Sequence, residues 1–182
     1  MSSRLRRVIP RLQNPSRWNQ NRSMKTSARS IAARWIATWF GCGYWPKGPG
    51  TAGSAAAIVV GLVLHHLWRT PAPAFGILAA LLLVPGIWAA GEVARQAGKK
   101  DPQFVVVDEV IGQWVTLAGA AALNWKSWLA AFLLFRIFDI WKPFPVRRIE
   151  SVPGGAGIVL DDVMAGVYAA LVLFTLGWFN LY

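Results

Sequence analysis

Acidic side chains beside long apolar segments are the residues of this sequence whose types and spacing could do chemistry. The chain has eight Asp and Glu residues. Five of them adjoin apolar runs: Asp108, Glu109, Asp139, Asp161 and Asp162. An ionised group in such a place is costly, so it is usually paired, metal-bound or functional. Clustered carboxylates without nearby Cys or His favour a hard cation, Mg²⁺ first and Mn²⁺ or Ca²⁺ after it. Ion pairing with Arg and Lys, together with helix capping, is the alternative interpretation.

The segment FRIFDIWKPFPVRR combines acidic and basic side chains. Arg136, Asp139 and Lys142 follow one another at three-residue steps, and on a helix this spacing places them on one broad face. A carboxylate between two cations can hold a metal while Arg and Lys bind phosphate oxygens. The alternative is a salt bridge at the membrane surface, and we interpret Arg147 and Arg148 as the positive flank of a membrane segment.

Two Gly-rich segments precede apolar runs. KGPGTAGS offers Lys47, the hydroxyls of Thr51 and Ser54, and exposed backbone N–H groups at a helix start, which favours anion binding. Either hydroxyl could instead serve only as a helix N-cap. GGAGIVLDD predicts a flexible loop that leads to adjacent acids at a helix N-terminus.

The sequence lacks the residues that two common phosphatase mechanisms require. Cys42 has Gly48 rather than Arg six positions later, and no D-x-D sequence occurs. A cysteine nucleophile and an aspartyl-phosphate intermediate are therefore not predicted. If the protein hydrolyses a phosphate ester, a metal-activated water is the nucleophile that the sequence favours.

The composition shows which elements must position these side chains. The chain is 55% hydrophobic and only 15% charged, with 11 Trp among 182 residues, a balance typical of membrane proteins. Apolar segments of about the length of a membrane-spanning helix cover residues 52–68, 74–90, 105–123, 128–140 and 163–179. We therefore expect an all-α membrane bundle of four to five spans, formed by residues 35–182.

Basic residues are distributed asymmetrically about these segments. If the N-terminus is cytoplasmic and five helices cross, sixteen of the 19 Lys and Arg residues fall on the cytoplasmic side. Only Arg69 and Lys126 fall on the other side, while Arg136 lies within a span. This agrees with the positive-inside rule. The same topology places every acidic and Gly-rich cluster at the cytoplasmic face.

Residues 1–34 have nine Lys or Arg and no acid, so we expect a disordered basic arm. It could contact anionic lipid headgroups, at about 1 kcal/mol per basic residue, act as a transit peptide, or be a solvated tail. A nucleic-acid partner is not expected, because the charge adjoins apolar spans and forms no basic face on a soluble domain.

The sequence closely resembles the bacterial phosphatidylglycerophosphatase A family. Four ordered stretches carry the resemblance: FGCGYWPKGPGTAGS (Phe40 to Ser54), VVDEVIGQW (Val106 to Trp114), FRIFDIWKPFPVR (Phe135 to Arg147) and GGAGIVLDDVMAG (Gly154 to Gly166). The resemblance implies a Mg²⁺-dependent phosphatase of the bacterial inner membrane with its active site facing the cytoplasm. Its substrate would be a phospholipid in the bilayer, phosphatidylglycerophosphate, which loses its terminal phosphate to give phosphatidylglycerol.

Taken with the residues, the resemblance suggests roles for the polar side chains. One or two Mg²⁺ ions would be held by Asp108, Glu109, Asp139 and Asp162. Asp161 would be a further ligand or the base that orients water. Phosphate would be bound by Lys47, Thr51, Ser54, Arg136 and Lys142. Small residues at Gly112, Ala165 and Gly166 would let the helices approach closely enough for the carboxylates to share a metal.

Three other functions are less consistent with the sequence. A small cation or proton transporter predicts acids near mid-span and similar polarity at both faces, whereas polarity here is one-sided. A lipid-binding or assembly factor would not need so many acids at one end of the helices. A phosphatidyltransferase would require the sequence D-G-x-x-A-R, which is absent.

Overall fold

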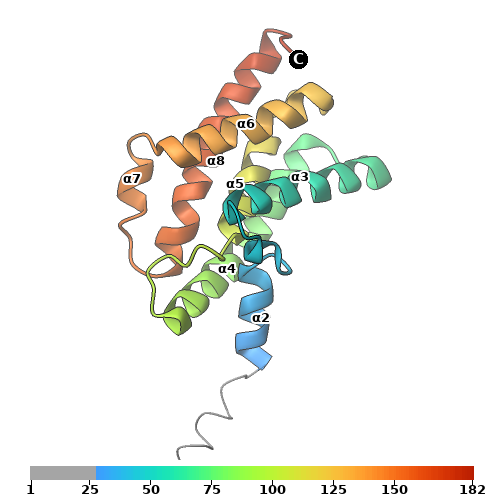
Figure 1. Ribbon diagram of the computed structural model, residues 1–182. Coiled ribbons are helices and arrows are strands. Elements are labelled where there is room, and N and C mark those ends of the chain that lie inside the picture. Colours follow the sequence, from blue (N-terminus) through green and yellow to red (C-terminus); the bar gives the residue numbers. More distant parts are fainter. Residues whose placement is uncertain (1–27) are drawn as a thin grey trace, which may run out of the picture.

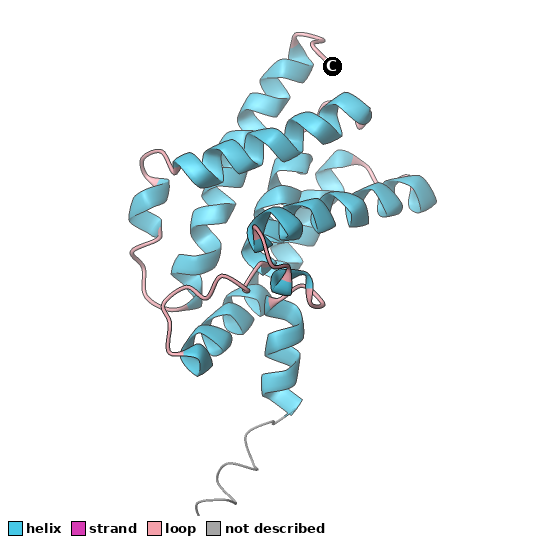
Figure 2. Ribbon diagram, viewed as in Figure 1, coloured by secondary structure: helices cyan, strands magenta, loops and turns pink. Residues whose placement is uncertain are grey.

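The computed structural model describes residues 28–182, which are all-helical and contain no strand (Figures 1 and 2). Helices α2, α3 and α4 cover Ala28–Ala37, Pro49–Trp68 and Ala72–Ala97, with a short 3₁₀ helix, η1, at Cys42–Tyr44. Helices α5, α6, α7 and α8 cover Val107–Ala118, Trp125–Trp141, Val146–Ile149 and Gly155–Trp178. The expected all-α class is confirmed.

Helix α5 lies at the centre of the bundle (Figure 1). It packs against α4 and α8 most extensively and also contacts α3 and α6. Val107, Val110, Ile111 and Leu117 of α5 are each at most 1% exposed. Because α5 is surrounded by other helices, the side chains of its first turn are enclosed by the protein.

Three helices are long and apolar enough to cross a membrane: α3 with 20 residues, α4 with 26 and α8 with 24. Their outward faces carry apolar side chains that only lipid would solvate well, among them Val63 of α3, Leu81 of α4 and Leu171 of α8. Helices α5 and α6 have only 12 and 17 residues. The protein is therefore of the membrane class, while the expected four to five crossings stay a prediction.

Helix α8 begins earlier than the sequence suggested. The Gly-rich stretch expected as a flexible loop is helical from Gly155, so Asp161 and Asp162 lie in the second turn and not at the N-terminus. A Cβ atom at Gly155 would overlap the carbonyl oxygen of Ile87 in α4, and one at Gly157 would overlap the carbonyl oxygen of Val152. These glycines therefore serve close packing rather than flexibility.

The predicted basic arm meets the described structure only at its end. Residues 1–27 lie outside the described residues, and residues 28–34 form the first part of α2. Helix α2 packs on α4 through its buried Ala33 and Ala37. The last seven residues assigned to a disordered arm are therefore helical, while the rest of that assignment stays a prediction.

Candidate active site

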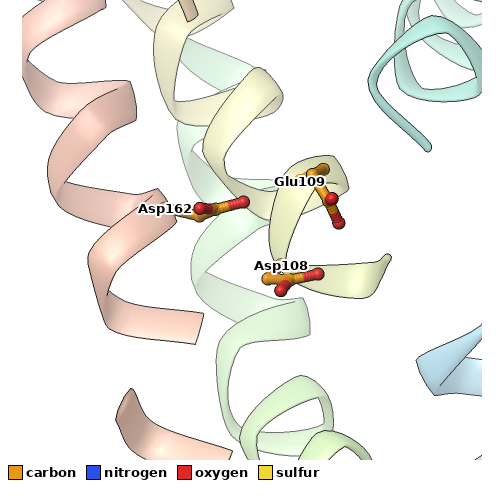
Figure 3. Close-up of side chains that lie close together, drawn as sticks. All are labelled: Asp108, Glu109 and Asp162. Atoms are coloured by element: carbon orange, nitrogen blue, oxygen red, sulfur yellow. The ribbon is translucent and has the colours of Figure 1, made fainter. Parts of the chain in front are cut away.

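Three carboxylates meet where α5 and α8 pack together (Figure 3). Asp108 and Glu109 come from the first turn of α5, and Asp162 comes from the second turn of α8. Each offers an oxygen that lies within 4.8 Å of the others. Residues that are more than fifty positions apart in the sequence therefore form one cluster, as the sequence analysis expected of these three.

The cluster is buried, and some of its carboxylate oxygens have no hydrogen-bond partner. Asp108 is 8% exposed and Asp162 is 4% exposed. Within residues 28–182, Oδ1 of Asp108 and Oε2 of Glu109 have no hydrogen-bond partner. Buried carboxylate oxygens without a partner are strongly unfavourable. A hard divalent cation would compensate them, and a purely carboxylate donor set fits such an ion. The cluster could therefore bind a metal.

Glycines make this convergence possible. A Cβ atom at Gly166 of α8 would overlap the carbonyl oxygen of Gly112 in α5. A Cβ atom at Gly112 would in turn lie 2.6 Å from the carbonyl oxygen of Asp162 and would overlap the ring of Phe135. The backbones of α5 and α8 are thus in contact beside the cluster, which confirms the close approach predicted for Gly112 and Gly166. Ala165 is fully buried and packs with Phe135.

The Gly-rich start of α3 adjoins the cluster. A Cβ atom at Gly50 would overlap Oε1 of Glu109 and lie 3.4 Å from Nη1 of Arg136. Lys47 and Thr51 line a neighbouring pocket of about 430 Å³. Ser54 differs from them, because its hydroxyl is fully buried and donates to the carbonyl oxygen of Gly50 at 3.0 Å. In this structure the hydroxyl of Ser54 thus bonds within α3, and its predicted contact with phosphate stays a prediction.

Arg136 and Asp139 form an ion pair at the end of α6. Nη1 of Arg136 donates to Oδ2 of Asp139 at 2.5 Å, and both side chains are largely buried. Nη1 of Arg136 lies near Glu109 as well, since a Cβ atom at Gly50 would meet both side chains. Asp139 is thus close to the three-carboxylate cluster but is not part of it. Its predicted role as a metal ligand stays a prediction, and the ion pair is the interaction that the structure shows.

Lys142 and Asp161 form the second ion pair of the site. Nζ of Lys142 donates to Oδ2 of Asp161 at 2.6 Å and lies 3.4 Å from Oε2 of Glu150. Burial lowers the pKa of Lys142, but the hydrogen bond and the nearby charges of Asp161 and Glu150 outweigh it and hold the pKa above its ordinary value of 10.5. Lys142 therefore stays charged near neutral pH.

Negative charge exceeds positive charge at this site. The five acids singled out from the sequence are all here, three in the cluster and two in ion pairs, and within residues 28–182 only Arg136 and Lys142 form ion pairs with any of them. A dianionic phosphate would be repelled by this excess unless a divalent cation bound first. The arrangement is suited to binding a metal and then a phosphate group between the metal and the two basic side chains.

Two contributors were missed by sequence reasoning. Glu150 lies beside Lys142, but it is not among the five acids that adjoin apolar segments, so nothing in the sequence indicated that it belongs to the site. Gly50 was one of several glycines in an anion-binding turn, and nothing in its spacing marked it as the residue against Glu109. The contact between Gly50 and Glu109 joins segments that are far apart in the chain, so local pattern carries no signal for it. Glu150 is near Lys142 in the sequence, but only the turn formed by residues 142–150 brings the two side chains together.

The chain was compared with known proteins. The family model described as Phosphatidylglycerophosphatase A matches residues 35–177. A protein of Bacteroides thetaiotaomicron that is provisionally named a phosphatidylinositol-3-phosphatase is 41% identical over 152 residues, which cover 79% of this chain and 92% of that protein. No solved structure matches the chain.

Two further relatives are named phosphatidylglycerophosphatase A. The Escherichia coli protein is 37% identical over 143 residues, which cover 78% of this chain and 81% of that protein. The Haemophilus influenzae protein is 38% identical over 147 residues, which cover 80% of this chain and 89% of that protein. The shared region contains every side chain of the site described above.

Proposed function

Because this chain belongs to the phosphatidylglycerophosphatase A family and is a membrane-associated phosphatase, we propose that it hydrolyses the terminal phosphomonoester of phosphatidylglycerophosphate. The products are phosphatidylglycerol and inorganic phosphate. Membership of a family of phosphatases also argues against the cation or proton transporter, which was the alternative function. The observation that carries the proposal is the cluster of Asp108, Glu109 and Asp162, because Oδ1 of Asp108 and Oε2 of Glu109 are buried without a partner and a cation would compensate them.

The cation that we propose is Mg²⁺. Asp108, Glu109 and Asp162 would hold it, because three carboxylates and no nitrogen or sulfur donor suit a small hard ion. When bound, Mg²⁺ supplies charge neutralisation for the phosphate group and lowers the pKa of water enough to make it a nucleophile. The excess of acidic over basic side chains leaves room for a second ion, with Asp139 next to the cluster.

The basic side chains would hold the phosphate group. Arg136 and Lys142 each donate one hydrogen bond to a carboxylate, and Lys142 also lies 3.4 Å from Glu150. A guanidinium has five N–H donors and an ammonium has three. Both can therefore keep Asp139 and Asp161 in place and still donate to phosphate oxygens. Lys47 and Thr51 border the pocket at the start of α3 and would contact the substrate from the other side.

Asp161 is the candidate for orienting the attacking water. It lies next to Asp162 in the sequence, and its Oδ1 accepts the backbone N–H of Asp162 at 3.0 Å. Its other oxygen is occupied by Lys142, which fixes the direction of the carboxylate. A carboxylate held in this way can accept a hydrogen bond from water without turning away.

We propose the bacterial inner membrane as the location, with the site open to the cytoplasm. The asymmetry of Lys and Arg about the apolar segments supports this orientation. Anionic headgroups are the proposed partners of the basic N-terminal residues.

A second substrate must be tested beside the first. The Bacteroides relative's name points to phosphatidylinositol 3-phosphate, which also carries a phosphomonoester on a lipid headgroup. The test is release of inorganic phosphate by the purified protein in neutral-detergent micelles. Phosphatidylglycerophosphate, phosphatidylinositol 3-phosphate and phosphatidic acid are compared, each with Mg²⁺ and with EDTA.

We expect Mg²⁺-dependent release with the highest kcat/KM for phosphatidylglycerophosphate. A higher value for either of the other lipids would show that the proposed substrate is wrong. Undiminished release in EDTA would show instead that the proposed metal dependence is wrong.

A further inference from the structure

A second pocket with basic side chains opens beside the active site, between the end of α6 and α7. Its volume is about 500 Å³, and it is lined by Trp141, Lys142, Pro143, Phe144, Arg147 and Arg148. Lys142 belongs to both sites, because its ammonium group lies in this lining and also donates to Asp161. Lys142 therefore connects the pocket to Asp161, the residue that precedes Asp162 of the cluster.

The two arginines of this pocket are available to a ligand. Both are exposed, and within the described part of the chain neither forms an ion pair with a carboxylate. The guanidinium of Arg148 lies 4.8 Å from the centre of the Phe144 ring, which orients it. Lys142, by contrast, is already shared between Asp161 and Glu150. Two unpaired guanidinium groups on one pocket favour a phosphate, because guanidinium binds phosphate oxygens in bidentate fashion.

The pocket is fixed to the helix that carries the active-site acids. The hydroxyl of Tyr168 in α8 donates to the carbonyl oxygen of Phe144 at 3.1 Å. Val146 is fully buried, and α7 packs against α8. Because α8 also carries Asp161 and Asp162, the position of the two arginines relative to the cluster is set by one rigid element.

Exposed aromatic side chains place the pocket at the level of lipid headgroups. Trp141 is 66% exposed and Phe144 is 70% exposed, and aromatic residues with polar neighbours are typical of the interface between membrane and water. A phosphate bound here would therefore belong to a lipid headgroup near the bilayer surface.

We propose that this pocket binds the internal phosphodiester of the substrate while its terminal phosphomonoester lies at the carboxylate cluster. The inference rests on the proposed function and deepens it, because it explains selection among lipid phosphates. A substrate with a phosphomonoester beyond a phosphodiester has two anionic groups, one for each site. Phosphatidic acid has only the phosphomonoester and would leave Arg147 and Arg148 without a ligand.

The test compares two lipids on three proteins. Wild type, Arg147→Gln/Arg148→Gln and the control Lys126→Gln are assayed in neutral-detergent micelles, where the only phosphodiester is that of the substrate. Lys126 is an exposed basic residue at the other end of α6, so its replacement removes charge without touching the pocket. KM and kcat are measured for phosphatidylglycerophosphate and for phosphatidic acid, and Arg147→Lys is added as the conservative variant.

We expect the double variant to raise KM for phosphatidylglycerophosphate about tenfold, with kcat nearly unchanged, because the lost contact does not involve the reacting atoms. KM for phosphatidic acid should stay the same, Lys126→Gln should match wild type, and Arg147→Lys should be intermediate. An equal rise for both lipids, or no rise for either, would overturn the pocket assignment alone. Absence of phosphatidylglycerophosphate hydrolysis by wild type would instead overturn the proposed function, and the pocket assignment with it.

Discussion

The ammonium group of Lys142 lies 2.6 Å from Oδ2 of Asp161 and ties the end of α6 to the second turn of α8. Asp161 is only 3% exposed, so its carboxylate depends on this cation for compensation. The next residue, Asp162, is one of the three clustered acids. The ion pair therefore links the segment that would bind phosphate to the helix that would bind the metal.

Replacing Lys142 by Met should destabilise the protein by about 2 kcal/mol, because it leaves the charge of Asp161 buried without a partner. Activity should fall as well. Thermal unfolding in detergent measures the first effect. Adding Asp161→Asn to Lys142→Met should recover most of the stability but none of the activity, and purely additive effects in this double-mutant cycle would contradict a direct interaction.

The pH dependence should show no titration of Lys142 near neutrality. The folded-state pKa lies above the ordinary value of 10.5, so the stability from the ion pair is complete below that value and is lost only as pH rises through the folded pKa. The pH–rate profiles of wild type and Lys142→Arg should therefore have the same shape from about pH 6 to pH 9. A fall in activity within this range that is present in wild type and absent in Lys142→Arg would contradict the assignment.

Gly166→Ala should separate α5 from α8, because the added methyl group would overlap the carbonyl oxygen of Gly112. Overpacking of this kind costs about 1–3 kcal/mol, and the shift should also weaken Mg²⁺ binding. Gly76→Ala is the matched control, since its methyl group would meet only the side chain of Ala118, at 3.2 Å. Thermal unfolding measures the loss of stability, and a Mg²⁺ titration measures the weaker binding. If Gly166→Ala and Gly76→Ala showed the same Tm and the same Mg²⁺ affinity, contact between α5 and α8 would be excluded as the cause.

Mg²⁺ should stabilise the folded protein. A ligand that binds only the folded state at a concentration one hundred times its Kd contributes about 2.7 kcal/mol, and binding at the cluster would also compensate the partnerless oxygens of Asp108 and Glu109. Tm should therefore rise with Mg²⁺ and fall back with EDTA in wild type. In the Asp162→Asn variant, Tm should change little when Mg²⁺ is added. A Tm that is insensitive to Mg²⁺ in wild type argues against a metal at this position.

The class of fold could be predicted from the sequence, and so could the proximity of Asp108, Glu109 and Asp162. Apolar segments separated by short polar ones predicted a helical membrane protein, and the acids beside those segments are the ones that gather around α5, α6 and α8. Acids are rare and costly in such surroundings, so their presence alone indicated function. The glycines Gly112 and Gly166 were also identified correctly, because close contact of helices requires small residues.

The pairing of the charges could not be predicted. Arg136 and Asp139 share a helix face by spacing, but only the packed structure shows that Asp139 is held by Arg136 outside the cluster. Lys142 could have paired with several acids, and the start of α8 at Gly155 decides that it meets Asp161. The burial of Ser54 could not be predicted either, because a hydroxyl in a Gly-rich helix start can be exposed to an anion or can bond within its own helix, and the structure shows the second arrangement.

The measurement that tests the central claim most directly is phosphate release from phosphatidylglycerophosphate by wild type, Asp108→Asn and Asp162→Asn over a Mg²⁺ titration. Glu92→Gln is the control, because Glu92 is an acid of α4 that pairs with Arg95 and lies outside the cluster. Asn keeps the shape of Asp and removes the charge that a cation requires. We predict Mg²⁺-dependent release by wild type and Glu92→Gln, and background release by the two cluster variants although both stay folded. Near-normal release by both cluster variants would contradict the assignment of this cluster as the metal-dependent active site.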